Sequence, residues 1–89
     1  MKPPDEKKEE LAKKILRYLL ANPYAQDTLK HIVKWWLFDQ YQTKLVEDVL
    51  NELEADGLVI AQDVSPSEKL YRMNRRRRKR ITSIVQQKS

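Results

Sequence analysis

The sequence predicts a mostly α-helical fold with a small antiparallel β-hairpin and an added C-terminal helix. Two segments, 28–37 and 42–56, carry apolar residues at the spacing that lines one face of an α-helix. The chain's only glycine, Gly57, follows the second segment, where a helix end needs a residue that adopts positive φ without strain. Two short segments, 58–62 and 69–73, then have the length and apolar pattern of β-strands.

Length and composition are those of one small, highly charged domain. The chain has 89 residues, of which 40% are hydrophobic and 35% charged. It contains no cysteine, so we expect neither disulfides nor thiolate metal sites. No apolar run reaches the roughly 18 residues of a membrane span, and the N-terminal MKPPDEKKEE lacks the apolar centre of a secretion signal. We therefore expect a cytoplasmic protein with no membrane partner.

The chain divides into three regions by composition. We expect a disordered N-terminus over 1–4, a folded domain over 5–74, and a basic C-terminal helix or tail over 75–89. The first helix of the domain is predicted over 6–21. It ends before Pro23, because a proline disfavours helical geometry at the residue that precedes it. Its apolar stripe contains Leu11, Ile15, Tyr18 and Leu19.

The second predicted helix, 28–37, begins after a polar residue that can serve as N-cap, either Asp27 or Thr28. A short strand before this helix is compatible with the predicted fold, but 22–26 has no strand pattern and none is included in the predicted order. The helix ends in two adjacent tryptophans that point about 100° apart. We expect Trp36 to lie in the apolar stripe and Trp35 to lie on its flank, half exposed.

The predicted hairpin is followed by a helix over 75–87, with Asn74 as its N-cap. Ile81, Ile84 and Val85 give this helix a narrow apolar stripe. Its first turns consist of six consecutive cations, Arg75 to Arg80, which we call the basic block. Because cations at a helix N-terminus oppose the helix dipole and repel one another, we expect frayed structure there unless an anion or an acidic partner surface binds.

Charge is unevenly distributed along the chain. Residues 1–17 carry six basic and four acidic side chains, residues 18–71 carry four basic and nine acidic ones, and residues 72–89 carry eight basic and no acidic ones. The segment balances of +2, −5 and +8 add to the net charge of +5. The positive charge therefore belongs to the C-terminal segment, while the central segment 18–71, which holds the presumed helix-turn-helix core, is acidic.

A tryptophan pair ends the second predicted helix, and the last predicted strand ends in Leu70-Tyr71-Arg72-Met73-Asn74. Together with the helix through Leu45–Leu53 and the turn Gly57-Leu58-Val59, this pattern resembles small bacterial winged helix-turn-helix proteins. The similarity spans roughly residues 10–86. It implies a winged helix-turn-helix with an added C-terminal helix, in which 42–56 is the recognition helix and the hairpin is the wing. Proteins of this fold bind DNA, RNA or other proteins, so fold alone does not decide function.

Nucleic-acid binding is the function that the resemblance and the basic block together favour, with duplex DNA as the expected ligand and transcription regulation as the expected role. The N-terminal turn of a recognition helix meets base edges, where glutamine pairs with adenine and lysine with guanine or phosphate. Lys69 and the arginines supply phosphate contacts. The predicted nucleic-acid-binding residues are Gln40, Tyr41, Gln42, Thr43, Lys44, Lys69, Arg72, Arg75, Arg76, Arg77, Arg78, Lys79 and Arg80.

The acidic side of the third helix keeps a second function open. Glu47, Asp48, Glu52, Glu54 and Asp56 would repel a polyanion. The alternative is a protein-interaction module that uses this acidic helix and the basic C-terminal helix, with an acidic protein as partner. A homodimer is also expected through the first or last helix. Arginines on the same face as the third helix's first turn would favour DNA, and arginines beside its acidic side would favour the interaction module.

Catalysis is not expected. His31 is the only histidine and stands on the polar side of its helix. The single glycine leaves no phosphate-binding loop, and no nucleophile motif includes His31. We therefore predict no catalytic residue, no cofactor, no metal and no small-molecule substrate.

Overall fold

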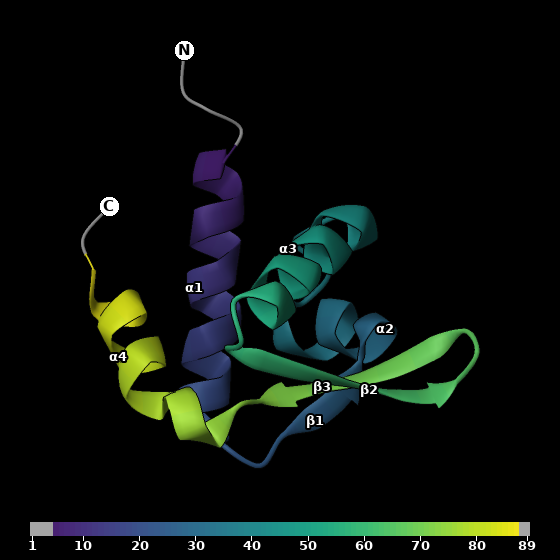
Figure 1. Cartoon of the computed structure of the whole chain (residues 1–89). Helices are drawn as coiled ribbons and strands as arrows, with labels where there is room; N and C mark the ends of the chain where they lie inside the picture. Colours follow the sequence, from purple (N-terminus) through teal and green to yellow (C-terminus); the bar gives the residue numbers. More distant parts are fainter. Residues whose placement is uncertain (1–4, 88–89) are drawn as a thin grey trace.

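The computed structural model describes residues 5–87, which form a mostly helical fold with one small antiparallel sheet (Figure 1). The predictions for 1–4 and 88–89 lie outside these residues. The helical elements are α1 (Asp5–Ala21), α2 (Leu29–His31), the π-helix η1 (Ile32–Trp36), α3 (Thr43–Ala55), the 3-10 helix η2 (Arg75–Arg77) and α4 (Arg78–Gln86). The strands are β1 (Gln26–Thr28), β2 (Val59–Ser65) and β3 (Glu68–Met73).

The sheet has the order β1-β3-β2, with both pairs antiparallel and β3 in the centre. The sequence predicts the β2–β3 hairpin, but the prediction that no strand precedes the second helix is wrong. The missed strand β1 is short and polar, and it pairs with β3 alone, in the register Gln26 opposite Arg72 and Thr28 opposite Leu70. No local pattern reveals such a strand, because its partner is more than forty residues away in the sequence.

The predicted ends of the central helices are largely confirmed. Thr28 is the N-cap, and its Oγ1 accepts a hydrogen bond from the His31 backbone N at 3.4 Å. The segment predicted as one helix over 28–37 is α-helical only to His31 and continues as the π-helix η1. Gly57 follows α3 with φ of +77°, as expected of a glycine that ends a helix.

The core lies where α1, α3, η1 and the sheet meet, and α4 contributes to it. Ile81 of α4 is fully buried together with α1 residues such as Leu16. Ile84 and Val85 pack partly against the same core. The Lys13 ammonium of α1 donates to the Gln87 carbonyl at 2.8 Å, which closes the end of α4 onto α1. The C-terminal helix is therefore part of the packed structure.

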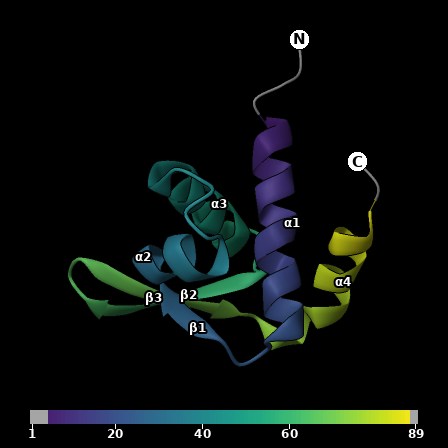
Figure 2. The same cartoon turned by 180° about the vertical axis from the view of Figure 1, so that it is seen from behind.

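Helix α1 stands between the two other helical parts of the molecule. Figure 1 shows α4 on one side of α1 and α2 and α3 on the other, and Figure 2 shows the same separation from behind. The β2–β3 hairpin extends away from α1 on the side of α2 and α3. No helix in the described part of the chain is long and apolar enough to cross a membrane.

Candidate nucleic-acid interface

The basic block begins at a well-defined junction between the sheet and α4. The Asn74 side chain caps η2, because its Oδ1 accepts from the Arg76 backbone N at 3.2 Å. Its Nδ2 donates to the Gly57 carbonyl at 2.8 Å. Six consecutive cations then form η2 and the first turn of α4, so the expected fraying is replaced by a capped 3-10 turn that leads into an α-helix. The cap and the burial of Ile81 hold this segment at both ends.

The side chains of the basic block are exposed and available to an external anion. All six residues are exposed, and across residues 5–87 none of them forms an ion pair. The guanidinium of Arg75 lies 4.7 Å from the ring centroid of Tyr24. An open hollow of about 660 Å³ lies on this surface. It is lined by Arg75, Arg76, Arg78, Lys79 and Thr82.

Arg72 is separated from the block by two residues but sits in a different environment. It is half-buried in the central strand β3, between Gln26 of β1 and Ile60 of β2. Its neighbours Tyr71 and Met73 are buried, whereas Arg72 points to the opposite face of the sheet, because side chains alternate along a strand.

The turn before α3 is held against α1 by the side chains predicted to contact bases. The Tyr41 hydroxyl donates to a Glu10 carboxylate oxygen at 3.3 Å. The Lys14 ammonium lies 3.5 Å from Gln40 Oε1 and 5.2 Å from the Tyr41 ring centroid. The side chains of Gln40 and Tyr41 thus have partners within the molecule. Gln42, the N-cap residue of α3, is exposed.

Lys44, the cation in the first turn of α3, is neutralised by its own helix. Its ammonium lies 3.1 Å from an Asp48 oxygen and 3.8 Å from a Glu47 oxygen. The hydrogen bond to Asp48 and the negative charges of Asp48 and Glu47 raise the pKa of Lys44 above its ordinary value. This lysine therefore adds little net positive charge to the surface of α3.

Thr43 and Lys69 line one cleft between α2, α3 and the hairpin, with a volume of about 550 Å³. The cleft carries both signs of charge. Its basic members are Lys30, Lys34 and Lys69, and its acidic members are Asp39, Glu47, Asp63 and Glu68. With four acidic and three basic side chains, this cleft is a poor site for a polyanion.

The predicted site residues are therefore divided between two surfaces. The basic block lies at the lower end of α1 and along the start of α4, whereas Gln42, Thr43, Lys44 and Lys69 lie on α3 and the hairpin (Figures 1 and 2). The block starts beside Gly57, at the C-terminal end of α3, because the Asn74 side chain donates to the Gly57 carbonyl. The first turn of α3 lies at the other end of that helix. Sequence reasoning could not place the arginines, because it does not give the side of α1 on which α4 packs.

Three exposed aromatic residues stand outside the predicted site. Tyr24, Trp35 and Phe38 are 80%, 60% and 74% exposed. Phe38 and Asp39 both have positive φ, 52° and 58°, in a turn directly after the π-helix η1. Positive φ costs roughly 1–2 kcal/mol at a residue other than glycine. For Tyr24 the only sequence signal was its position next to Pro23 in a loop.

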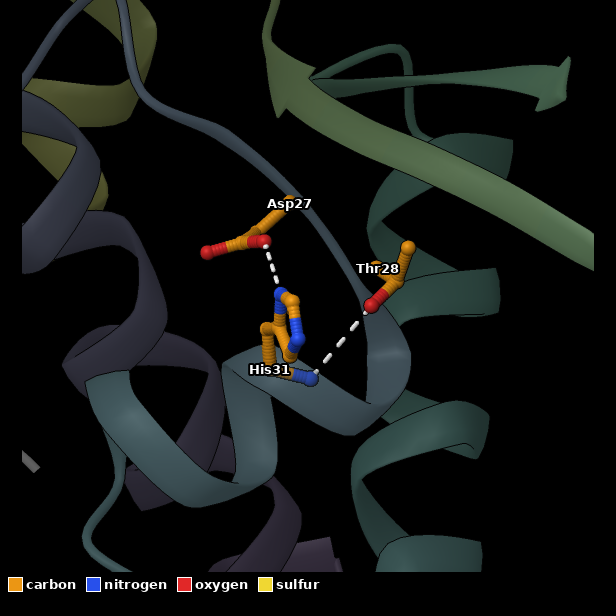
Figure 3. A network of polar contacts seen from close by, with 3 residues as sticks. All are labelled: Asp27, Thr28 and His31. Carbon is orange, nitrogen blue, oxygen red and sulfur yellow. Dashed lines mark hydrogen bonds and ion pairs between the residues drawn. The ribbon is translucent and has the colours of Figure 1, made fainter.

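His31 contributes to the junction between β1 and α2. Its Nδ1 lies 2.8 Å from Asp27 Oδ1, next to the Thr28 cap (Figure 3). This contact connects the strand to the first turn of the helix that follows it. Among the described residues, no group of acidic, histidine or cysteine side chains is arranged to hold a metal ion.

Comparisons with protein-family models, with curated proteins and with solved structures find no match to this chain.

Proposed function

We propose that this chain is a winged helix-turn-helix protein that binds nucleic acid through the phosphate backbone, with the basic block as its anchor. The order of helices, the hairpin and the strand β1 beside it support the fold assignment. The observation that supports nucleic-acid binding most strongly is the exposure of the basic block and its lack of ion pairs. Six exposed cations lie on a folded surface and lack an ion pair in the described chain.

Uncompensated cations on a rigid surface are suited to phosphate contacts. Neutralising each phosphate releases condensed counterions, which gives sequence-independent affinity. The Asn74 cap fixes the start of the block, so less side-chain and backbone freedom is lost on binding than from a flexible tail. Duplex DNA, the ligand expected from the sequence, has a dense and regular array of phosphates.

Base reading by α3 has less support than phosphate binding by the block. Gln40 and Tyr41 are held by α1, and Lys44 is paired with Asp48 and Glu47. A duplex at the α3 surface would also meet the acidic side of this helix. The basic block starts instead beside Gly57, at the other end of α3 from its first turn. Phosphate contacts position a protein on a duplex without reading its sequence, so we expect little sequence preference.

Two variants with equal charge changes test this function. In the block variant, Arg76, Arg77, Arg78 and Lys79 are replaced by glutamine. In the matched control, Lys30, Lys34, Lys44 and Lys69 on the α3 side are replaced by glutamine. Each set lowers the net charge from +5 to +1, since four positive charges are removed.

Binding of each variant to a labelled random duplex is measured by fluorescence anisotropy at low salt. We expect the block variant to lose about tenfold or more in affinity, and the control to lose clearly less. Equal losses would mean that net charge alone drives binding. A larger loss in the control would place the interface at α3. Failure of the wild type to bind either this duplex or a single strand of the same length would exclude the function.

A second candidate is protein interaction through the acidic side of α3. Glu54 and Asp56 are exposed there, and within 5–87 neither forms an ion pair. The basic block and this acidic side form no ion pair with one another in the described chain, so a second copy of the chain could pair them. Light scattering at low and high salt tests this arrangement. A mass that rises with concentration at low salt only would support it, and a monomer at every concentration would exclude it.

A further inference from the structure

Tyr24 is a large aromatic side chain that stands in solvent beside the basic block. It lies in the loop between α1 and β1 and is 80% exposed, the highest value among the large hydrophobic residues described. A ring with this exposure gains little from burial in the core. The residue that holds it is Arg75, whose guanidinium lies 4.7 Å from the ring centroid. The ring therefore contacts the block through Arg75 and remains open to a ligand.

Arg75 connects the ring to the surface that we assign to phosphates. The same arginine stacks on Tyr24 and lines the hollow formed with Arg76, Arg78 and Lys79. Thr82 is the hollow's one uncharged lining residue, and its hydroxyl donates to the Arg78 carbonyl at 3.0 Å. An aromatic ring and several cations thus border one surface. Proteins that bind single strands combine the same two features, a basic groove for the backbone and aromatic rings for the bases.

We propose that Tyr24 is a stacking platform for an unpaired base, so that the surface formed by Tyr24 and the basic block prefers single-stranded nucleic acid to a blunt duplex. This preference rests on the proposed function and specifies its ligand class. In a blunt duplex the bases are stacked on one another, and only the backbone reaches the block. In a single strand a base is free to leave its neighbours and stack on the ring, while flanking phosphates contact the arginines.

The other cation–aromatic pair that lies at the surface provides a matched control. The Lys34 ammonium lies 5.3 Å from the ring centroid of Trp35, which is 60% exposed. This pair belongs to η1, which lies with α2 on the other side of α1 from α4 (Figure 2). Its chemistry resembles that of the Arg75–Tyr24 pair, but it lacks the neighbouring block. Trp35→Ala therefore removes an exposed ring without touching the proposed site.

The experiment uses three labelled ligands: an oligothymidine, an abasic oligonucleotide with the same number of phosphates, and a blunt duplex. The full chain is compared with Tyr24→Ala, Tyr24→Phe and Trp35→Ala by fluorescence anisotropy at one salt concentration. Circular dichroism verifies that each variant is folded. We expect folded variants, because both rings are exposed and their removal leaves no cavity in the core.

We expect Tyr24→Ala to weaken oligothymidine binding by about fivefold or more, the lower end of what one base–aromatic stack contributes. Its affinity for the abasic strand should stay unchanged, because that ligand has no base to stack. Tyr24→Phe should retain affinity for oligothymidine, and Trp35→Ala should leave it unchanged. The wild type should also bind oligothymidine more tightly than the duplex.

Two results would overturn the stacking role. If Tyr24→Ala weakens abasic and oligothymidine binding equally, the ring only positions Arg75. If it changes neither, Tyr24 makes no contact with the ligand. In both cases salt-dependent binding by the block leaves the proposed function standing. If the wild type binds none of the three ligands, the stacking role fails together with the proposed function.

Discussion

Asn74 and Gly57 are joined by a hydrogen bond of 2.8 Å from the asparagine Nδ2 to the glycine carbonyl. The same asparagine caps η2 through its Oδ1, and its backbone N donates to the Leu58 carbonyl at 3.0 Å. The end of α3, the start of β2 and the start of the basic block therefore meet at one residue. A change at Asn74 should affect both the folded domain and the placement of the arginines.

Substitution of Asn74 by alanine removes both side-chain hydrogen bonds. We expect Asn74→Ala to lower the free energy of unfolding by about 1–3 kcal/mol, since a lost cap and a lost hydrogen bond each cost about 1 kcal/mol. Asn74→Ser keeps an oxygen for the cap and loses the donor to Gly57 without placing a second acceptor against that carbonyl, so its loss should be smaller. Urea denaturation measures the free energy of unfolding of both variants. Equal losses of stability in the two would show that the cap contributes nothing.

Ile81 should be the residue of α4 on which stability depends most. It is fully buried, whereas Ile84 packs only partly against the core. We expect Ile81→Ala to lower the free energy of unfolding by about 2–5 kcal/mol, in the range of large-to-small core substitutions. Ile84→Ala should cost clearly less. If urea denaturation shows that Ile81→Ala leaves stability unchanged, α4 is not part of the cooperative core.

Tyr71 predicts a loss of stability in alkaline solution. Burial, followed by the negative charges of Glu47 and Glu54, raises the pKa of this phenol above its ordinary value of 10.0. The unfolded chain then loses the phenol proton at lower pH than the folded chain does. The contribution of the Tyr71 hydroxyl to the free energy of unfolding is therefore fully present below about pH 10. It is lost as the pH rises through the pKa of Tyr71 in the folded chain.

Tyr71→Phe tests this pH dependence because it keeps the ring and removes the ionisable hydroxyl. We expect wild-type stability to fall between about pH 9 and pH 11 and the variant to fall less over the same interval. Lys44, whose pKa is raised by Asp48 and Glu47, adds a loss in the same alkaline direction in both proteins. Parallel curves from urea denaturation across this range would show that Tyr71 does not contribute.

Local signals in the sequence were sufficient where one residue type determines the backbone. Gly57 at positive φ, the Thr28 cap and the Asn74 cap follow from steric and hydrogen-bonding properties of those residues. The strand β1 was missed because its only sheet neighbour is β3, far along the chain. The π-helical turn at Ile32–Trp36 was missed because its apolar spacing is almost that of an α-helix.

The candidate site was predictable in composition and unpredictable in geometry. The basic block is plain in the sequence, but its position at the lower end of α1 depends on how Asn74 and Ile81 pack. The pairing of Lys44 with Asp48 follows from their spacing of four residues on a helix. The contacts of Gln40 and Tyr41 with α1 depend instead on the turn at Phe38 and Asp39. Charge counting along the chain therefore identified the arginines and could not show which surface they form.

The dependence of binding on salt tests the central role of the basic block most directly. The logarithm of the observed binding constant for a random duplex is plotted against the logarithm of salt concentration. For the wild type we expect a slope of about −3 or steeper, because each neutralised phosphate contributes about −0.9. In the variant with Arg76, Arg77, Arg78 and Lys79 replaced by glutamine, the slope should become much shallower. A slope that is unchanged in that variant would contradict phosphate binding by the block.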